Sequence, residues 1–192
     1  MGAQAYRLLS LYEPDPGWLV EVGSERGEGS TAWLRDYAER TGLGFTTCDI
    51  DPAQHAEAER IAPGHAICGR GRDVIAQTKP ISAAYLDGFD FIPPGREGDG
   101  FITEQRDRYD ELGFTLSNGR CHAEHLAEAK ALERRANRRC VVICDDTWQG
   151  PRGGWKGKGA TAVPYLLRHG FCVIEVVQRE KTSLGATVLR RG

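Results

Sequence analysis

The sequence predicts a three-layer, doubly wound α/β fold with a mostly parallel seven-stranded sheet that ends in an antiparallel hairpin. Apolar runs typical of buried strands alternate with segments whose apolar residues recur at helical spacing, which favours a parallel sheet with helices on both faces. The last two β-rich runs, residues 171–178 and 184–189, are separated only by a short polar link, which favours a hairpin. The length of 192 residues fits one domain, which we expect to span residues 1–192.

The first half of the chain is expected to begin with a βαβ unit. A short apolar strand over residues 18–22 is followed by a glycine-rich turn and a helix over residues 30–40. A β-rich run over residues 45–50 stops at Asp51-Pro52, where proline suits the first turn of a helix over residues 53–61. Further predicted elements are strands over 64–68 and 81–87 and a brief helix over 73–77.

The second half holds two segments without clear periodicity. Residues 89–119 are rich in proline, glycine and charge, so we expect a long loop with at most a short helix over 103–110. Residues 149–159 form a glycine-rich basic loop. Because few residues precede the first strand, we expect these two segments to form the substrate lid. The remaining predicted elements are an amphipathic helix over 122–137, a strand over 140–146 and a helix over 160–168.

Composition narrows the class of protein. The net charge of -2 and the pI near 6.2 argue against a surface built throughout for nucleic acid, although such a partner stays open. The sequence shows no signal peptide and no apolar run long enough to span a membrane. We expect five cysteines to be free and buried in strands, which indicates a reducing cytoplasm. These are Cys48, Cys68, Cys140, Cys144 and Cys172.

The turn after the first strand has the features of a ligand site. Gly23, Gly27 and Gly29 allow a tight turn and a close approach of the backbone to a ligand. The helix that follows offers unpaired N–H groups, which favour an anionic group. Asp49, at the end of the second strand, can accept hydrogen bonds from both hydroxyls of a ribose. A nucleoside-containing cofactor is therefore expected.

These motifs carry a resemblance to a known family. The runs Val20 to Thr31 and Thr47 to Pro52 resemble the first two motifs of class I S-adenosylmethionine-dependent methyltransferases, which have a Rossmann-like fold. Residues 85–88 and 142–147 resemble the motifs of the fourth and fifth strands, and the branch most similar contains catechol-type O-methyltransferases and cephalosporin-hydroxylase-like proteins. The resemblance implies an S-adenosylmethionine site formed by Glu21, Gly23, Ser24, Gly27, Ser30, Thr31, Asp49, Ile50, Gly71 and Asp87.

Acidic side chains at two strand ends are candidates for the reacting end of the site. Asp87, Asp145 and Asp146 offer hard oxygen ligands for Mg²⁺ or Ca²⁺, which can lower the pKa of a bound hydroxyl and orient it. The metal-dependent O-methyltransferases that this sequence resembles carry acids at the same strand ends. Asp87 acting without a metal, and Asp145 capping a turn, remain alternatives.

Other candidates lie in or beside the two irregular segments. His122 can take a proton at neutral pH, so it joins Asp87 and Asp146 as a candidate catalytic residue, with His125 a weaker one. We expect Asp90, Trp155 and Lys156 to contact the substrate.

The main prediction is methyl transfer from S-adenosylmethionine to a hydroxyl of a small molecule. One alternative is an NAD-dependent oxidoreductase, although Gly23, Gly27 and Gly29 do not have the Gly-x-Gly-x-x-Gly spacing. A non-catalytic binding or assembly module on the same fold is another. Base methylation of nucleic acid is disfavoured because its usual motifs are missing, and a homodimer remains open.

Overall fold

The computed structural model describes residues 4–24, 29–178 and 185–192. Its main sheet has seven strands in the order β3-β2-β1-β4-β5-β9-β8, and a separate two-stranded hairpin joins β6 to β7. The strands are β1 (Trp18–Val22), β2 (Gly44–Asp49), β3 (Ala66–Cys68), β4 (Ile81–Leu86), β5 (Ala136–Asp145), β6 (Thr147–Gln149), β7 (Trp155–Gly157), β8 (Phe171–Val177) and β9 (Ala186–Arg191). β1 to β5 run parallel in the main sheet, whereas β9 is antiparallel to both β5 and β8. The predicted sheet and its C-terminal hairpin are confirmed.

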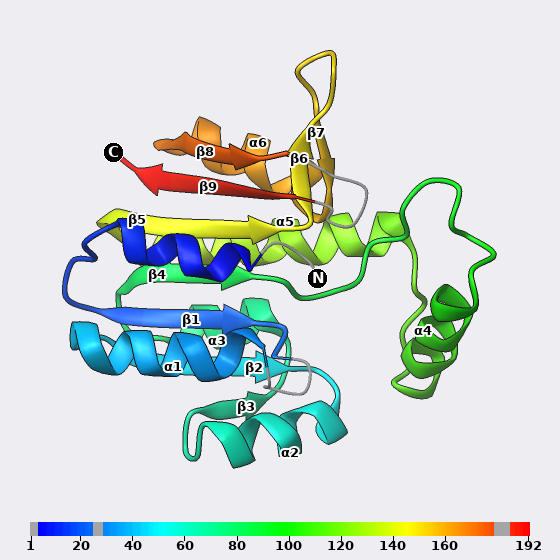
Figure 1. The fold of residues 1–192 in the computed structure, drawn as a ribbon, viewed down its shortest axis with the longest axis horizontal. Helices are drawn as coiled ribbons and strands as arrows, with labels where there is room; N and C mark the ends of the chain where they lie inside the picture. The colour runs from blue at the N-terminus through cyan, green and yellow to red at the C-terminus, as the bar shows by residue number, and fades with distance from the viewer. Residues whose placement is uncertain (1–3, 25–28, 179–184) are drawn as a thin grey trace.

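Helices cover both faces of this sheet (Figure 1). One face carries α3, α5 and α6 over a core that includes Val22, Leu86 and Leu132. The other carries α1 and the 3-10 helix η1 over a core that includes Leu34 and Tyr85. The helical segments are η1 (Ala5–Leu11), α1 (Ser30–Thr41), α2 (Pro52–Ile61), α3 (Gly71–Gln77), α4 (Gly100–Glu111), α5 (Asn118–Arg135), η2 (Lys158–Ala160) and α6 (Ala162–Arg168).

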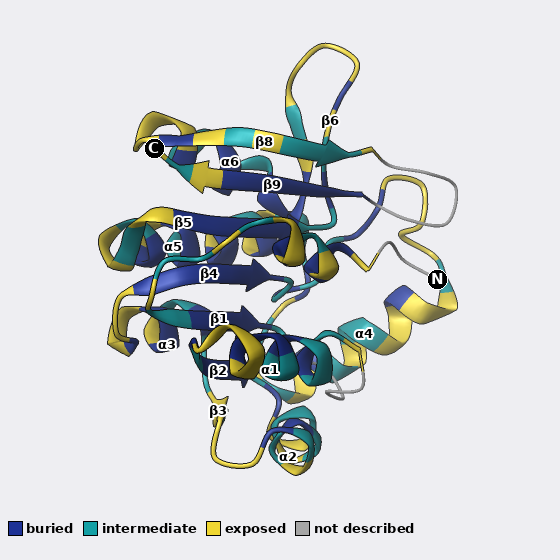
Figure 2. Ribbon diagram, turned by 60° about the vertical axis from the view of Figure 1, so that its left-hand side comes forward, coloured by how far each residue is buried: buried dark blue, intermediate teal, exposed yellow. Residues whose placement is uncertain are grey.

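The register of the parallel strands places their carboxyl ends at one edge. Val22 pairs with Cys48 on one side and with Leu86 on the other, and Leu86 pairs in turn with Cys144. The residues that follow these strand ends therefore lie at a common rim, as expected for an open α/β sheet. Figure 2 shows that the central strands are buried along most of their length.

The two irregular segments contain more regular structure than the sequence predicts. α4 has 12 residues, and its side chains Ile102 and Tyr109 join Phe89 and Leu116 in a small apolar cluster of their own. In the glycine-rich loop, β6 and β7 form a short hairpin whose tip projects from the main sheet (Figure 1). The apolar cluster around α4 and the β6–β7 hairpin thus give regular structure to two segments whose sequences show no extended pattern of apolar residues.

The start of one helix and the exposure of two cysteines also differ from the predictions. α5 begins four residues earlier than predicted, at Asn118, because the Ser117 hydroxyl accepts a hydrogen bond from the Arg120 N–H at 3.2 Å and caps the helix. Cys68 and Cys172 are exposed rather than buried, because they lie on the edge strands β3 and β8. Among the described residues, no helix is long and apolar enough to cross a membrane.

Candidate functional site

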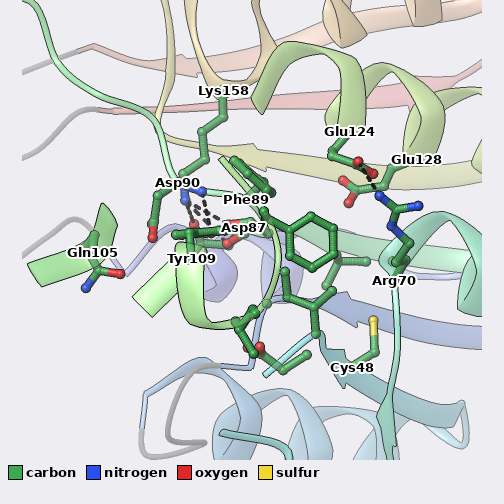
Figure 3. Close-up of a pocket in the computed structure, with 18 of the residues that line it drawn as sticks. Cys48, Arg70, Asp87, Phe89, Asp90, Gln105, Tyr109, Glu124, Glu128 and Lys158 are labelled. Atoms are coloured by element: carbon green, nitrogen blue, oxygen red, sulfur yellow. Dashed lines mark hydrogen bonds and ion pairs between the residues drawn. The ribbon is translucent and has the colours of Figure 1, made fainter. Parts of the chain in front are cut away.

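A pocket of about 250 Å³ opens at the carboxyl ends of β1, β2 and β4 (Figure 3). Its floor includes Val22 and Gly23 after β1, and Cys48 and Asp49 at the end of β2. The first residues of α3, the inner face of α5 and the insert that contains α4 supply its walls. The pocket therefore lies at the rim where the sequence predicts a cofactor.

Gly23 is the position where only glycine fits. Its φ of +86° lies in the left-handed region, and a Cβ there would stand 2.4 Å from the carbonyl oxygen of Asp87. The Gly23 N–H donates to the Cys48 carbonyl at 2.9 Å, and the Asp87 N–H donates to the Val22 carbonyl at 2.9 Å. The turn thus holds the ends of β1, β2 and β4 close together at the pocket floor.

Glu21 lies beneath the turn rather than in the pocket. Its side chain is fully buried and accepts hydrogen bonds from three hydroxyls: Thr31 at 2.7 Å, Thr47 at 2.6 Å, and Ser30. Burial raises the pKa of Glu21, and the three hydroxyls act in the opposite direction. Glu21 therefore ties α1 and β2 to β1, and it positions the turn without lining the pocket.

The other predicted residues of the turn have different surroundings. The hydroxyls of Ser30 and Thr31 are committed to Glu21, so these residues offer the start of α1 rather than their side chains. Ser24 is buried, and its hydroxyl has no hydrogen-bond partner within the described part of the chain. Gly27 lies outside the described residues.

Asp49, Ile50 and Gly71 all line the pocket, on the side of β2 and α3. Asp49 Oδ1 accepts a hydrogen bond from the Asp51 N–H at 2.9 Å, which fixes the carboxylate at the strand end. Asp51 caps α2 through the Ala53 N–H at 2.8 Å, as its place before Pro52 predicts. Asp51 Oδ2 also accepts a hydrogen bond from Arg108 Nε of α4 at 2.7 Å, so this ion pair joins the insert to the rim.

A buried lysine lies at the centre of the acidic strand ends. Lys158 Nζ is 2.5 Å from Asp87 Oδ1 and 3.5 Å from Asp146 Oδ2, and all three residues line the pocket. Figure 3 shows Lys158 and Asp87 side by side. Burial alone would lower the pKa of Lys158, but Asp87, Asp146 and Asp90 outweigh it and raise the pKa well above its ordinary value. Lys158 is therefore a permanent cation in this site.

This arrangement corrects the predicted metal site. The ammonium of Lys158 occupies the space between Asp87 and Asp146 that a shared cation would need. Asp145 turns away and accepts a hydrogen bond from the Tyr85 hydroxyl. No group of three or more His, Cys, Asp or Glu side chains among the described residues can hold a metal ion. The described acids therefore do not fit Mg²⁺ or Ca²⁺, because the ammonium group of Lys158 already balances the charge of Asp87 and Asp146.

The remaining predicted residues are not all brought to the pocket. Asp90 lines it, but His122, Trp155 and Lys156 do not. His122 Nε2 donates to the Gly157 carbonyl at 3.1 Å, and Trp155 packs against the apolar core. Lys156 is exposed on β7.

His125 lies behind the pocket in a fully buried position. Its Nε2 is 3.3 Å from the Phe89 carbonyl, and burial lowers its pKa to about 3. His125 is therefore neutral at physiological pH, with its ring proton on Nε2 facing that carbonyl.

Several pocket residues were not predicted from the sequence. Lys158 lies two residues beyond Lys156, within a loop whose cations are otherwise exposed. Glu124 and Glu128 come from a helix whose sequence indicates only amphipathic packing. Phe101, Gln105 and Tyr109 come from α4, within the predicted lid segment. The only sequence signal for the last group was the length of the segment between β4 and α5.

Comparisons with known proteins define the fold of this chain. No family model and no curated protein sequence matches it. Among solved structures, a protein from Clostridium thermocellum described provisionally as an rRNA methylase has a TM-score of 0.63 and 10% identity, covering 98% of this chain and 96% of that one.

Two further structures contain S-adenosyl-L-homocysteine. The N-methyltransferase NodS from Bradyrhizobium japonicum has a TM-score of 0.58 and 13% identity over 98% of this chain and 84% of that one. An O-methyltransferase from Bacillus cereus has a TM-score of 0.57 and 10% identity over 98% of this chain and 79% of that one. The fold is therefore that of these methyltransferases, whose acceptors include different classes of molecule.

Proposed function

We propose that this protein is an S-adenosylmethionine-dependent methyltransferase that transfers a methyl group to a hydroxyl of a small molecule. The observation that carries the proposal is the placement of Asp49 at the end of β2, in a pocket at the rim of a sheet with this fold. A carboxylate at that position can accept hydrogen bonds from both hydroxyls of a ribose.

The charge of the pocket favours a cationic methyl donor over a dinucleotide. Six acidic side chains and three basic ones line it, and Lys158 is already paired with two of the acids. An excess of carboxyl groups opposes the pyrophosphate of NAD, whereas it favours the positive sulfonium of S-adenosylmethionine. The described residues therefore fit this cofactor better than the dinucleotide.

The cofactor would extend from the turn at Gly23 across Asp49 toward Gly71. Gly23 lies against the Asp87 carbonyl with no side chain at this part of the pocket, and Ser24 has a buried hydroxyl that lacks a partner among the described residues. When bound, S-adenosylmethionine supplies a methyl group activated by its positive sulfur.

The residues around Lys158 are suited to activate a hydroxyl. Lys158 stabilises an oxygen that is losing its proton, and Asp146 accepts that proton from the pocket side. With S-adenosylmethionine bound, the acceptor oxygen would form a bond to the methyl carbon while the carbon–sulfur bond broke and left both its electrons on sulfur, which would become neutral. Lys158 thereby takes the part that a metal ion plays in metal-dependent enzymes.

The insert with α4 would cover the acceptor. Phe101, Gln105 and Tyr109 face the pocket from this helix, and the Arg108–Asp51 ion pair holds the helix at the rim. A lid with apolar and amide side chains suits a small organic molecule that carries a hydroxyl.

Calorimetric titration with S-adenosylmethionine, S-adenosylhomocysteine and NAD tests the proposed cofactor. We expect both adenosyl compounds to bind and NAD not to bind. Asp49→Ala should weaken adenosyl binding at least tenfold, which is about 1.4 kcal/mol. Asp110→Ala, at an exposed position of α4, is the control and should bind like the wild type. Binding of NAD alone would reject the proposal.

Methyl transfer from labelled S-adenosylmethionine to a panel of phenols, catechols and hydroxy acids, and separately to RNA, tests the acceptor. We expect label in a small hydroxyl compound, with equal rates in EDTA and in Mg²⁺ because Lys158 supplies the cation. Label in RNA alone would replace the proposed acceptor class. Tight adenosyl binding without transfer to any acceptor would favour the binding-module alternative.

A further inference from the structure

Glu128 is a buried carboxyl that the proposed methyl transfer does not use. It lies on the inner face of α5 (Figure 3), has 4% of its surface exposed, and lines the pocket beside Gly71 and Gly88. A Cβ at Gly71 would stand 2.8 Å from Glu128 Oε1, and one at Gly88 would stand 3.3 Å from it. Glycine at both positions therefore leaves room for this oxygen at the pocket wall.

The second oxygen of Glu128 faces a histidine. Oε2 has no hydrogen-bond partner among the described residues, and it lies 3.3 Å from His125 Nδ1. Because the proton of neutral His125 lies on Nε2 toward the Phe89 carbonyl, Nδ1 presents a lone pair to Oε2. Two lone pairs at this distance repel, so the arrangement favours a proton on Oε2.

The electrostatic surroundings agree with this protonation. Burial, and then the carboxylate of Glu124, raises the pKa of Glu128 to about 8, although Lys158 and Arg72 act in the opposite direction. Oε1 is then the carbonyl oxygen of a neutral acid, and it accepts hydrogen bonds but donates none. The titratable groups around Glu128 are Cys48 from β2, Arg72 from α3, Cys121, Glu124 and His125 from α5, Cys144 from β5, and Lys158 from η2.

Glu128 Oε1 lies where the proposed cofactor would have its base. In the proposed placement of the cofactor, with its ribose at Asp49 on β2, the base would extend toward the start of α3, where Gly71 lines the pocket beside β3. No acid directly follows β3, because Gly69, Arg70 and Gly71 occupy that position. The carboxyl group on this side of the pocket thus comes from α5 instead.

We propose that Glu128 is the residue that selects adenine, with Oε1 accepting a hydrogen bond from the exocyclic amino group and Oε2 held by His125. This inference rests on the proposed cofactor. A purine with a carbonyl oxygen in place of the amino group would set two acceptors against each other, and it would bind weakly.

Binding of S-adenosylhomocysteine and of its deaminated analogue, S-inosylhomocysteine, tests the inference by calorimetry. We expect the wild type to bind S-adenosylhomocysteine at least tenfold more tightly. Glu128→Gln should keep this preference, because the amide carbonyl replaces Oε1 and the amide NH₂ can donate to His125 Nδ1. Glu128→Leu should bring the two affinities within about twofold of each other, and Glu133→Leu, at the far end of the same helix, should keep the preference.

Each outcome decides between the two proposals. Failure of the wild type to bind S-adenosylhomocysteine overturns the proposed function and this inference together. Binding of both compounds with equal affinity, or an unchanged preference in Glu128→Leu, overturns the inference alone. If Glu128→Leu does not fold, the wild type and Glu128→Gln still test the inference. Both should prefer S-adenosylhomocysteine to S-inosylhomocysteine, and loss of this preference in Glu128→Gln contradicts Oε1 as the acceptor.

Discussion

Replacing Glu128 with glutamine should make the ligand-free protein more stable at alkaline pH. The pKa of Glu128 rises from an ordinary value of 4.5 to about 8 on folding, so the folded chain retains a proton that the unfolded chain has lost between these two values. The contribution of Glu128 to stability is therefore fully present below pH 4.5 and is lost as the pH rises toward 8. Glutamine has nearly the same shape and does not ionise.

The size of this effect follows from the shift in pKa. Each unit of difference between the folded and unfolded states corresponds to about 1.4 kcal/mol. For a carboxyl buried this deeply, the free energy of unfolding of the wild type should fall by about 4 kcal/mol, relative to that of Glu128→Gln, between pH 5 and pH 9. The glutamine variant lacks this dependence, so the difference between the two proteins isolates Glu128 from all other titrating groups.

Urea denaturation followed by tryptophan fluorescence at pH 5, 7 and 9 measures this difference. Glu104→Gln removes one carboxyl at an exposed position of α4 and should follow the wild-type profile. If the difference between wild type and Glu128→Gln changes by less than about 1 kcal/mol over this range, the inferred neutral state of Glu128 is wrong.

Three further substitutions probe the site. Lys158→Met leaves Asp87 without its cation and should lower the free energy of unfolding by about 3 to 5 kcal/mol in urea at pH 7, which an unchanged midpoint would contradict. Glu21→Ala leaves the buried hydroxyls of Thr31 and Thr47 and the partly buried hydroxyl of Ser30 without their acceptor, so we expect a loss on the order of 3 kcal/mol and a lower calorimetric Tm; a loss below about 1 kcal/mol would rule out the bracing role. Asp51→Ala removes the cap of α2 and the partner of Arg108, and a loss of about 1 to 2 kcal/mol in urea is expected, whereas no loss would show that neither contact contributes.

The sheet could be predicted because its signals are local. Apolar runs such as residues 81–86 are buried along their whole length, and the acids that end them reach the rim whenever the strands are parallel. Asp49, Asp87 and Asp146 line the pocket for this reason. Strand position within the sheet is not local, and so the exposure of Cys68 and Cys172 on edge strands could not be predicted from their apolar neighbours.

The presence of Lys158 in the pocket depends on the backbone conformation at Gly157, which the sequence does not reveal. Gly157 has φ of +80°, and a Cβ there would stand 1.8 Å from the carbonyl oxygen of Asp146, so the backbone at the end of β7 lies directly against that acid. Lys156 precedes Gly157 and stays exposed, whereas Lys158 follows it and enters the pocket. Two lysines in the same glycine-rich loop thus have opposite surroundings.

Glu128 poses the same difficulty in a different form. On the sequence it is one of several charged residues of an amphipathic helix, and such residues are usually solvated. It is buried because Gly71 and Gly88, which lie 57 and 40 residues earlier in the chain, leave space for its oxygen at the pocket wall. A carboxyl facing two glycines from separate strand ends has no local signature, so its part in binding could be inferred only after the fold had brought the three residues together. A larger residue at Gly71 should therefore disturb the base end of the pocket before it disturbs the reacting end at Lys158.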